Sequence, residues 1–173
     1  MLRLLALGLV ACLSLLLDGC SFFGGGVPAV EVGEVRVQAM ADANRNSPIV
    51  LGVVMIADTD LEKRVLSPDL HWFDSDADLA ATYPSALQAY RCELSPGQEM
   101  QLPASLFKGQ RAYTVLLLAA MGNVERRARI DNWRHGGVIA IGRDNWQVTP
   151  NTKPAQKTLR LKEMQCKTSG QAS

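Results

Sequence analysis

Apolar and polar residues alternate along much of the chain from residue 29 onward, which is the pattern of half-buried β-strands. The phase of the alternation changes at Gly33, where we expect a β-bulge. Residues 49–57 are instead continuously apolar and rich in β-branched side chains, which is typical of a central strand buried on both faces. Between these stretches, the polar turn 42–47 is short enough to join two neighbouring antiparallel strands. The alternating apolar positions of the first stretch are Val30, Val32, Val35, Val37 and Ala39.

The pattern changes over residues 58–90. A helix or turn can begin at Ser67-Pro68, and short helical stretches are expected at 77–81 and 84–90, so we predict a helical insertion beside the sheet. From residue 91 onward the strand pattern returns. Several short strands with turn signals predict a β-sandwich over residues 30–166, followed by a disordered tail at 167–173. The further strands are expected at 99–102, 111–120, 138–141 and 157–164.

The N-terminal segment has the layout of a secretory signal peptide. Arg3 supplies a positive charge, and residues 4–17 are almost all apolar or small before the run stops at Asp18. A transmembrane helix needs roughly 20 apolar residues to cross the hydrocarbon core, and this run is shorter. Residues 115–121 are also strongly hydrophobic, but a run of that length is typical of a buried strand. We therefore expect export, with residues 1–19 as the signal peptide.

The end of this segment, Leu17-Asp18-Gly19-Cys20, resembles the lipobox of bacterial lipoproteins, although Asp18 departs from the usual small or apolar residue. The resemblance implies that Cys20 is diacylated on its sulfur and becomes the new N-terminus. A lipobox ending at Cys12 is one alternative, and an uncleaved signal anchor is another. Ser21 stands where retention in the inner membrane would require Asp, so the sorting rule of lipoproteins implies an outer-membrane anchor facing the periplasm. Residues 20–29, with three consecutive glycines, predict a flexible tether.

Composition limits the possible partners and cross-links. The formal net charge of the 173-residue chain is +1, which argues against a nucleic-acid partner, because that ligand requires a basic face. Beyond the lipobox candidates, the remaining cysteines are Cys92 and Cys166. In an oxidising periplasm an isolated pair favours a disulfide, and two separately buried thiols are the alternative.

Little in the chain predicts catalysis or metal binding. Asp74, Asp76 and Asp78 resemble the start of a calcium loop, but the glycine and glutamate that such a loop requires further on are missing. A solvated, acidic start of a helix is therefore favoured. His71 and His135 have no neighbouring residues with the spacing of zinc ligands. Because the sequence also lacks a nucleophile elbow and a phosphate-binding glycine loop, we expect no enzyme activity, metal or cofactor.

Basic side chains cluster at Arg126, Arg127 and Arg129, shortly before Trp133-Arg134. Arginine and tryptophan are favoured anchors of protein interfaces, so this segment is a candidate surface for an acidic partner. The alternative is a solvated turn between two strands.

The order of several local patterns resembles the TssJ family, the outer-membrane lipoproteins of type VI secretion systems. The resemblance covers roughly residues 35–161. The sequence departs from the family at Met121-Gly122, where an aromatic residue and an arginine are expected. The matching patterns are Asn44-Arg45-Asn46-Ser47-Pro48-Ile49-Val50, Trp72-Phe73 with Asp78-Leu79, Leu94-Ser95-Pro96-Gly97, the hydrophobic stretch 115–120 and Trp133-Arg134.

This resemblance implies a fold, a role and a partner. The implied fold is a transthyretin-like or immunoglobulin-like β-sandwich with a short helical insertion. The implied role is that of a structural component of the secretion membrane complex, and its partner is the periplasmic domain of a large inner-membrane protein (TssM). The contact region carried over from the family's loop between its first two strands is Asp42, Ala43, Asn44, Arg45, Asn46 and Ser47.

Two other functions stay open at this point. A pilotin-like or assembly lipoprotein for another secretion channel would present an exposed apolar groove. A periplasmic ligand-binding domain or enzyme would enclose a pocket lined by convergent polar groups.

Overall fold

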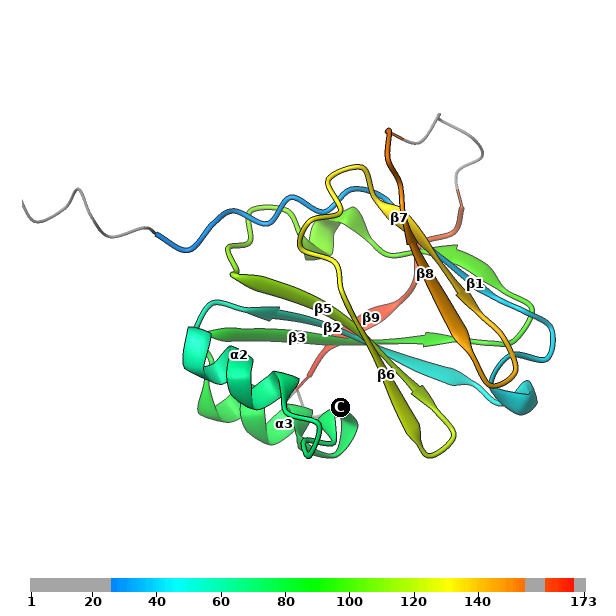
Figure 1. Cartoon of the computed structure of the whole chain (residues 1–173), viewed down its shortest axis with the longest axis horizontal. Helices are drawn as coiled ribbons and strands as arrows, with labels where there is room; N and C mark the ends of the chain where they lie inside the picture. The colour runs from blue at the N-terminus through cyan, green and yellow to red at the C-terminus, as the bar shows by residue number, and fades with distance from the viewer. Residues whose placement is uncertain (1–25, 155–160, 170–173) are drawn as a thin grey trace, which may run out of the picture.

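The computed structural model describes residues 26–154 and 161–169. Two β-sheets pack face to face, and two helices cover the outer face of the larger sheet (Figure 1). The expected β-sandwich with a helical insertion is therefore confirmed. The expected signal peptide at 1–19 and both candidate lipidation residues, Cys12 and Cys20, lie outside the described residues, as do residues 20–25 of the expected tether and 170–173 of the expected tail.

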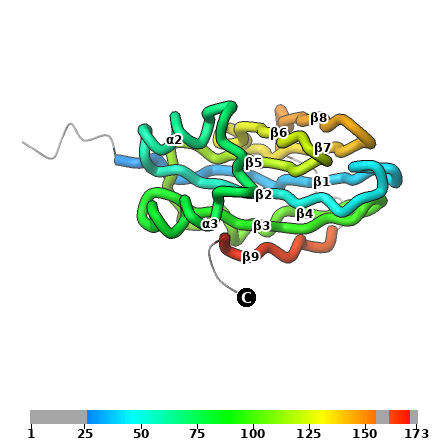
Figure 2. The backbone as a smooth tube through the Cα atoms, turned by 90° about the horizontal axis from the view of Figure 1, so that it is seen from below, coloured from blue at the N-terminus to red at the C-terminus, as the bar shows by residue number. Residues whose placement is uncertain are grey.

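Nine strands form the two sheets of the described residues. In chain order they are β1 (Val35–Ala39), β2 (Ile49–Ile56), β3 (Leu87–Leu94), β4 (Glu99–Gln101), β5 (Thr114–Met121), β6 (Val124–Arg129), β7 (Gly137–Ile141), β8 (Trp146–Pro150) and β9 (Cys166–Thr168). The smaller sheet has the order β4-β1-β7-β8, and the larger has the order β6-β5-β2-β3-β9. β1 and β7 are parallel, whereas each of the other paired strands is antiparallel to its neighbours. In the view turned by 90°, the strands of the two sheets lie over one another (Figure 2).

β2 is buried on both faces, as its continuously apolar sequence predicted. Val53 and its neighbours on one face join the core between the two sheets. Val54 and Ile56 on the other face join a second core beneath the helices, together with Trp72. Gly52 makes room for that indole, because a Cβ at this position would lie 3.1 Å from Trp72 Nε1. One central strand thus contributes to both hydrophobic cores.

The two helices lie between β2 and β3. α2 (Thr59–Leu66) was not expected; it begins where the Asp58 carboxylate accepts hydrogen bonds from the backbone N–H groups of Asp60 (2.9 Å) and Leu61 (2.8 Å). α3 (Trp72–Thr82) extends the predicted helix at 77–81 in both directions. The helix expected at 84–90 is wrong, because the chain enters β3 at Leu87 and buries alternate side chains against the helices.

The turn 42–47 does not join neighbouring strands, contrary to the prediction. β1 lies in the smaller sheet and β2 in the larger, so the turn carries the chain from one layer to the other. It contains a 3-10 element, η2 (Ala43–Asn46), in which Asn44, Arg45 and Asn46 have φ angles of 47°, 56° and 64°. Asparagine tolerates this left-handed region better than most residues, which explains why two of the three positions are asparagine.

Two strands were not anticipated, and a third lies elsewhere than expected. β6 is an edge strand with a largely polar sequence, and β8 is an edge strand in which apolar and polar residues alternate. The interpretation of 126–129 as a turn is therefore wrong. In the described part of the strand expected at 157–164, one isolated bridge joins Glu163 to Gln101. The C-terminal strand is instead β9, which includes two residues of the expected tail. Gly33 lies outside the strands, where a Cβ would come within 2.5 Å of Gly136 N, so close backbone approach rather than a bulge requires the glycine.

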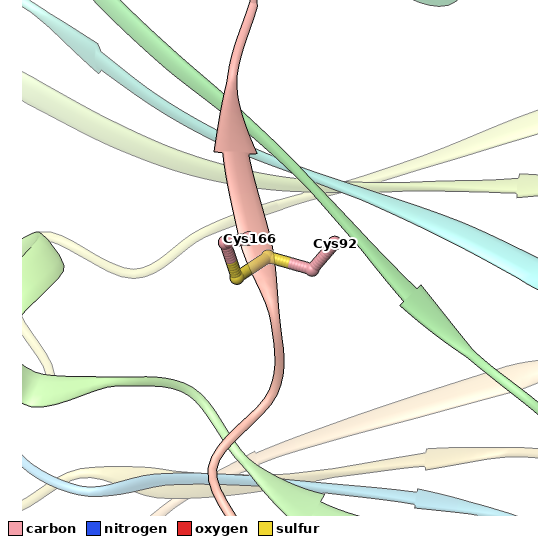
Figure 3. Close-up of a disulfide and its surroundings, with 2 residues drawn as sticks. All are labelled: Cys92 and Cys166. Carbon is pink, nitrogen blue, oxygen red and sulfur yellow. A yellow bond between two sulfur atoms is a disulfide. The ribbon is translucent and has the colours of Figure 1, made fainter. Parts of the chain in front are cut away.

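The C-terminal strand is fastened to the larger sheet by a disulfide (Figure 3). Cys92 of β3 and Cys166 of β9 lie directly opposite each other, with their Cα atoms 4.2 Å apart. Nearby, the Asp76 carboxylate of α3 accepts hydrogen bonds from Arg91 Nε at 2.6 Å and from Ser169 Oγ at 2.7 Å. Burial raises the pKa of Asp76, but the two donors outweigh it, so this pKa lies below its usual value.

The two ends of the sandwich differ in what they present. Residues 28–30 run beside 110–112, where Val30 N–H donates to Gln110 O at 2.9 Å and Ala112 N–H donates to Pro28 O at 3.0 Å. The start of the described chain lies at one end of the long axis, and the turn 42–47 lies at the opposite end (Figures 1 and 2). No helix among the described residues combines the length and apolar character needed to cross a membrane.

Candidate partner-binding surface

Three turns meet at the end of the sandwich remote from the start of the described chain. They are the β1–β2 turn at 42–47, the β5–β6 turn at 122–123 and the β7–β8 turn at 142–145. The backbone N–H of Asn44 donates to Gly142 O at 3.1 Å, which ties the first turn to the third. Between the turns lies an open cavity of about 420 Å³, here called the turn cavity. Its lining includes Asn44, Arg45, Asn123, Arg126, Arg143 and Asp144.

Asn44 holds the first turn in its left-handed conformation. Its side chain is buried, and Nδ2 donates to Pro48 O at 2.9 Å. Ala43 is also buried, so these two members of the predicted contact set form the scaffold of the turn. The structure leaves the other four members exposed to solvent, and these are Asp42, Arg45, Asn46 and Ser47.

The charged groups of the turn cavity converge on Asp144. Arg45 Nε lies 2.6 Å from Asp144 Oδ1, and Arg143 Nε lies 3.8 Å from Asp144 Oδ2. Arg126 Nη2 donates to the backbone oxygen of Asp144 at 3.3 Å. Two guanidinium groups therefore share the Asp144 carboxylate and a third contacts its backbone oxygen, so three arginines surround one acidic residue and leave the cavity positively charged. Guanidinium groups bind carboxylates through paired N–H donors, so this arrangement suits an acidic group of a partner protein.

The predicted arginine-rich surface is divided by the structure. Arg127 donates to the backbone oxygens of Val65 at 3.0 Å and Ser67 at 2.9 Å, and also to that of Leu70. It therefore holds the segment between α2 and α3 against β6. Arg129 pairs with Glu62 at 3.0 Å, which fastens α2 to the same strand.

The remaining members of that predicted surface have different roles. Trp133 is 4% exposed and belongs to the core between the sheets, so it cannot anchor a partner. Arg134 forms an exposed ion pair with Glu31 at 3.0 Å. Only Arg126 is directed into the turn cavity. Of the β6 arginines in the predicted interface, Arg126 alone therefore belongs to the candidate surface.

Sequence reasoning missed the contributions of Asn123, Arg143 and Asp144 to this surface. Each lies in a turn that precedes or follows one of the two unanticipated strands, so the turns could not be placed. A signal was present, because Gly122-Asn123 and the run from Gly142 to Asn145 are rich in residues that favour turns. The convergence of the turns depends on the packing of the two sheets.

The acidic cluster that resembled a calcium loop lies on α3. Asp76 is buried against Arg91, whereas Asp74 and Asp78 are exposed to solvent. Because the Asp76 carboxylate is buried against Arg91, away from the exposed Asp74 and Asp78, the three do not form a common set of ligands. Within residues 26–154 and 161–169, no group of three His, Cys, Asp or Glu side chains has the arrangement of a metal site.

Comparison with solved structures identifies the architecture. The type VI secretion lipoprotein TssJ1 from Pseudomonas aeruginosa aligns with a TM-score of 0.53 at 14% sequence identity, over 70% of this chain and 96% of that chain. The chain shares the fold of TssJ1. The fold implied by the sequence resemblance is therefore confirmed.

A second solved structure aligns less well. Lip from Serratia marcescens, described as a membrane-bound component of the type VI secretion system, gives a TM-score of 0.44 at 14% identity, over 69% of this chain and 96% of that chain. No protein-family model matches the chain, and no curated protein matches it.

Proposed function

We propose that this chain is an outer-membrane lipoprotein of a type VI secretion membrane complex, where it binds the periplasmic domain of a large, TssM-like inner-membrane protein. The observation that carries the proposal is the fold shared with TssJ1, which is itself a type VI secretion lipoprotein. The signal-peptide pattern and the lipobox-like Leu17-Asp18-Gly19-Cys20 support the same role from an independent part of the sequence.

The positions of the two ends support a specific orientation. A lipid on Cys20 would hold the domain by the end where the described chain starts, whereas the turn 42–47 lies at the opposite end (Figures 1 and 2). Residues of this turn line the turn cavity. The turn cavity would then point away from the outer membrane and into the periplasm, where a domain from the inner membrane arrives. Asp42, Arg45, Asn46 and Ser47 are exposed on that end and form the proposed contact.

The charge of the turn cavity favours binding over chemical turnover. Its charged groups are three arginines and Asp144, and the side chain of Arg45 is 72% exposed. Such a site can recognise a carboxylate, but it offers no activated nucleophile or general base. We therefore propose a structural role without enzymatic activity.

Co-purification from the host tests the proposal with a matched pair of variants. Arg45 and Arg134 each form an exposed ion pair, but Arg134 pairs with Glu31 and does not line the turn cavity. We expect the wild-type chain and Arg134→Glu to recover a large inner-membrane protein with a periplasmic domain. Arg45→Glu should reduce that recovery, and Cys20→Ser should release the chain from the outer membrane.

The proposal fails if the wild-type chain recovers a secretin-type channel subunit, or recovers no membrane protein. The contact region alone fails if Arg45→Glu and Arg134→Glu recover the inner-membrane protein equally well.

A further inference from the structure

We infer that the outer edge of β6 accepts an extended, acidic segment of a partner protein as an additional strand of the larger sheet. The identity of that partner rests on the proposed function. The chemistry of the edge does not, because it follows from the register, the hydrogen bonds and the charges of β6.

The register shows which backbone groups of β6 face outward. Met121 and Val124 pair across the two-residue turn at 122–123, so they form a hydrogen-bonded pair, and such pairs recur at every second residue. The hydrogen bond from Ile130 N–H to Val115 O continues the same alternation. The backbone groups that point away from β5 are those of Glu125, Arg127 and Arg129.

These outward backbone groups have no hydrogen-bond partner among the described residues. β6 is also the longest edge strand of the two described sheets, with six residues against three in β4, five in β8 and three in β9. A free edge of this kind can pair with an incoming strand.

Charged side chains often protect an edge strand from such pairing. In β6 three of them are already bound on the face that carries the helices. Glu125 accepts a hydrogen bond from Trp72 N–H at 2.8 Å, Arg127 binds the segment between α2 and α3, and Arg129 pairs with Glu62. These groups hold the helices, so they are not available to block the edge.

A groove of about 590 Å³ runs along this edge, here called the edge groove. Leu66 and Leu70 line it on the side of the helices, and Trp146 lines it on the side of the smaller sheet. Leu66 is 42% exposed and Val124 is 49% exposed, so apolar surface is accessible in the groove. Because side chains of an added strand alternate between its two faces, apolar side chains on one face could contact Leu66 and Leu70, while the side chains on the other face would meet Arg126 and Trp146.

The charge of the edge determines which kind of partner segment it can bind. Arg126 is the only arginine of β6 without a carboxylate partner among the described residues. Among the described residues, the Nε atom of Arg126 is buried and has no hydrogen-bond partner. Arg126 lines both the edge groove and the turn cavity, so the groove is continuous with the proposed contact surface. A carboxylate on the incoming segment would complete this site, whereas a second copy of β6 would bring arginines close to one another.

Two synthetic peptides test the inference on the mature chain carrying Cys20→Ser. One alternates valine and aspartate, and the other alternates valine and lysine. Amide hydrogen exchange, followed by NMR, should slow by about tenfold at Glu125, Arg127 and Arg129 when the valine–aspartate peptide is bound, since strand pairing buries these N–H groups. The valine–lysine peptide should leave their exchange unchanged.

Arg126→Ala should weaken binding of the valine–aspartate peptide by about tenfold, as expected for the loss of a charge-assisted hydrogen bond, and the matched control Arg134→Ala should not. The inference is overturned if these amides are not protected, if both peptides bind equally, or if a dimer of the chain protects the same amides without peptide. The peptides replace the inner-membrane partner, so this outcome is independent of whether co-purification supports the proposed function.

Discussion

Replacing Arg127 with alanine is expected to lower the free energy of unfolding by about 3 kcal/mol. The Arg127 side chain is 20% exposed and donates to the backbone oxygens of Val65, Ser67 and Leu70 as well as to the Glu125 carboxylate. Hydrogen bonds that involve a charged group contribute roughly 1.5–3 kcal/mol each. The edge groove gives water access to this region, so water should hydrogen-bond to some of the backbone oxygens that lose Arg127 as a donor. The expected loss of stability is therefore well below the sum of the separate hydrogen bonds.

The assay is urea denaturation of the mature chain carrying Cys20→Ser, followed by circular dichroism. A loss of that size corresponds to a decrease in Tm of about 10 °C in a domain of this length. Arg127→Lys should be intermediate, because an ammonium group can pair with Glu125 but cannot reach three carbonyl oxygens at once. Arg126→Ala is the matched control on the same strand and should change the free energy of unfolding by less than about 1 kcal/mol.

The reasoning is refuted if Arg127→Ala costs less than about 1 kcal/mol, or no more than Arg126→Ala. Either result would mean that the loop between the helices is held by contacts other than this guanidinium. It would also return Arg127 to the set of side chains available for a partner.

Three further predictions concern the core and the C-terminal strand. Replacing both Cys92 and Cys166 with serine should lower the free energy of unfolding, measured by urea denaturation, by about 4 kcal/mol, because the disulfide closes a sequence separation of 74 residues. A decrease below about 1 kcal/mol would show that the disulfide does not restrain the unfolded chain in this way. The pKa of Asp76 is lower in the folded state, so its contribution to stability is present above the usual pKa of 3.8 and is lost as the pH falls below it. Asp76→Asn should accordingly flatten the loss of stability measured between pH 5 and more acidic solutions, and an unchanged pH profile would contradict this account. Gly52→Ala should lower the free energy of unfolding by about 1–3 kcal/mol, because the added methyl group would lie 3.1 Å from the buried Trp72 indole. An unchanged Tm would show that the indole can move to make room for it.

Sequence patterns by themselves determined the class of fold and its central elements. The continuous apolar run predicted β2 as a strand buried on both faces, since a strand that serves two cores cannot alternate. The short stretch at 99–102 was correctly predicted as a strand, and it forms β4 at an edge of the smaller sheet. The N-terminal pattern predicted export and a lipid anchor at Cys20, which stay predictions.

Tertiary structure decided the elements whose residues carry little hydrophobic signal. The sequence of β6 resembled a polar turn because Arg127 donates to backbone oxygens of the segment between the helices and Arg129 pairs with Glu62. Such contacts leave no periodic apolar pattern. The helix expected at 84–90 became strand β3 because pairing with β2 outweighs local helical preference.

The candidate surface depends on tertiary structure to a still greater degree. The turn 42–47 could be singled out in the sequence, but its crossing between the sheets requires three left-handed residues in succession. Its neighbours Arg126 and Asp144 come from turns and strands far along the chain. A hydrophobic pattern records which side chains are buried, whereas the meeting of distant turns is set by strand register and by the packing of one sheet on the other.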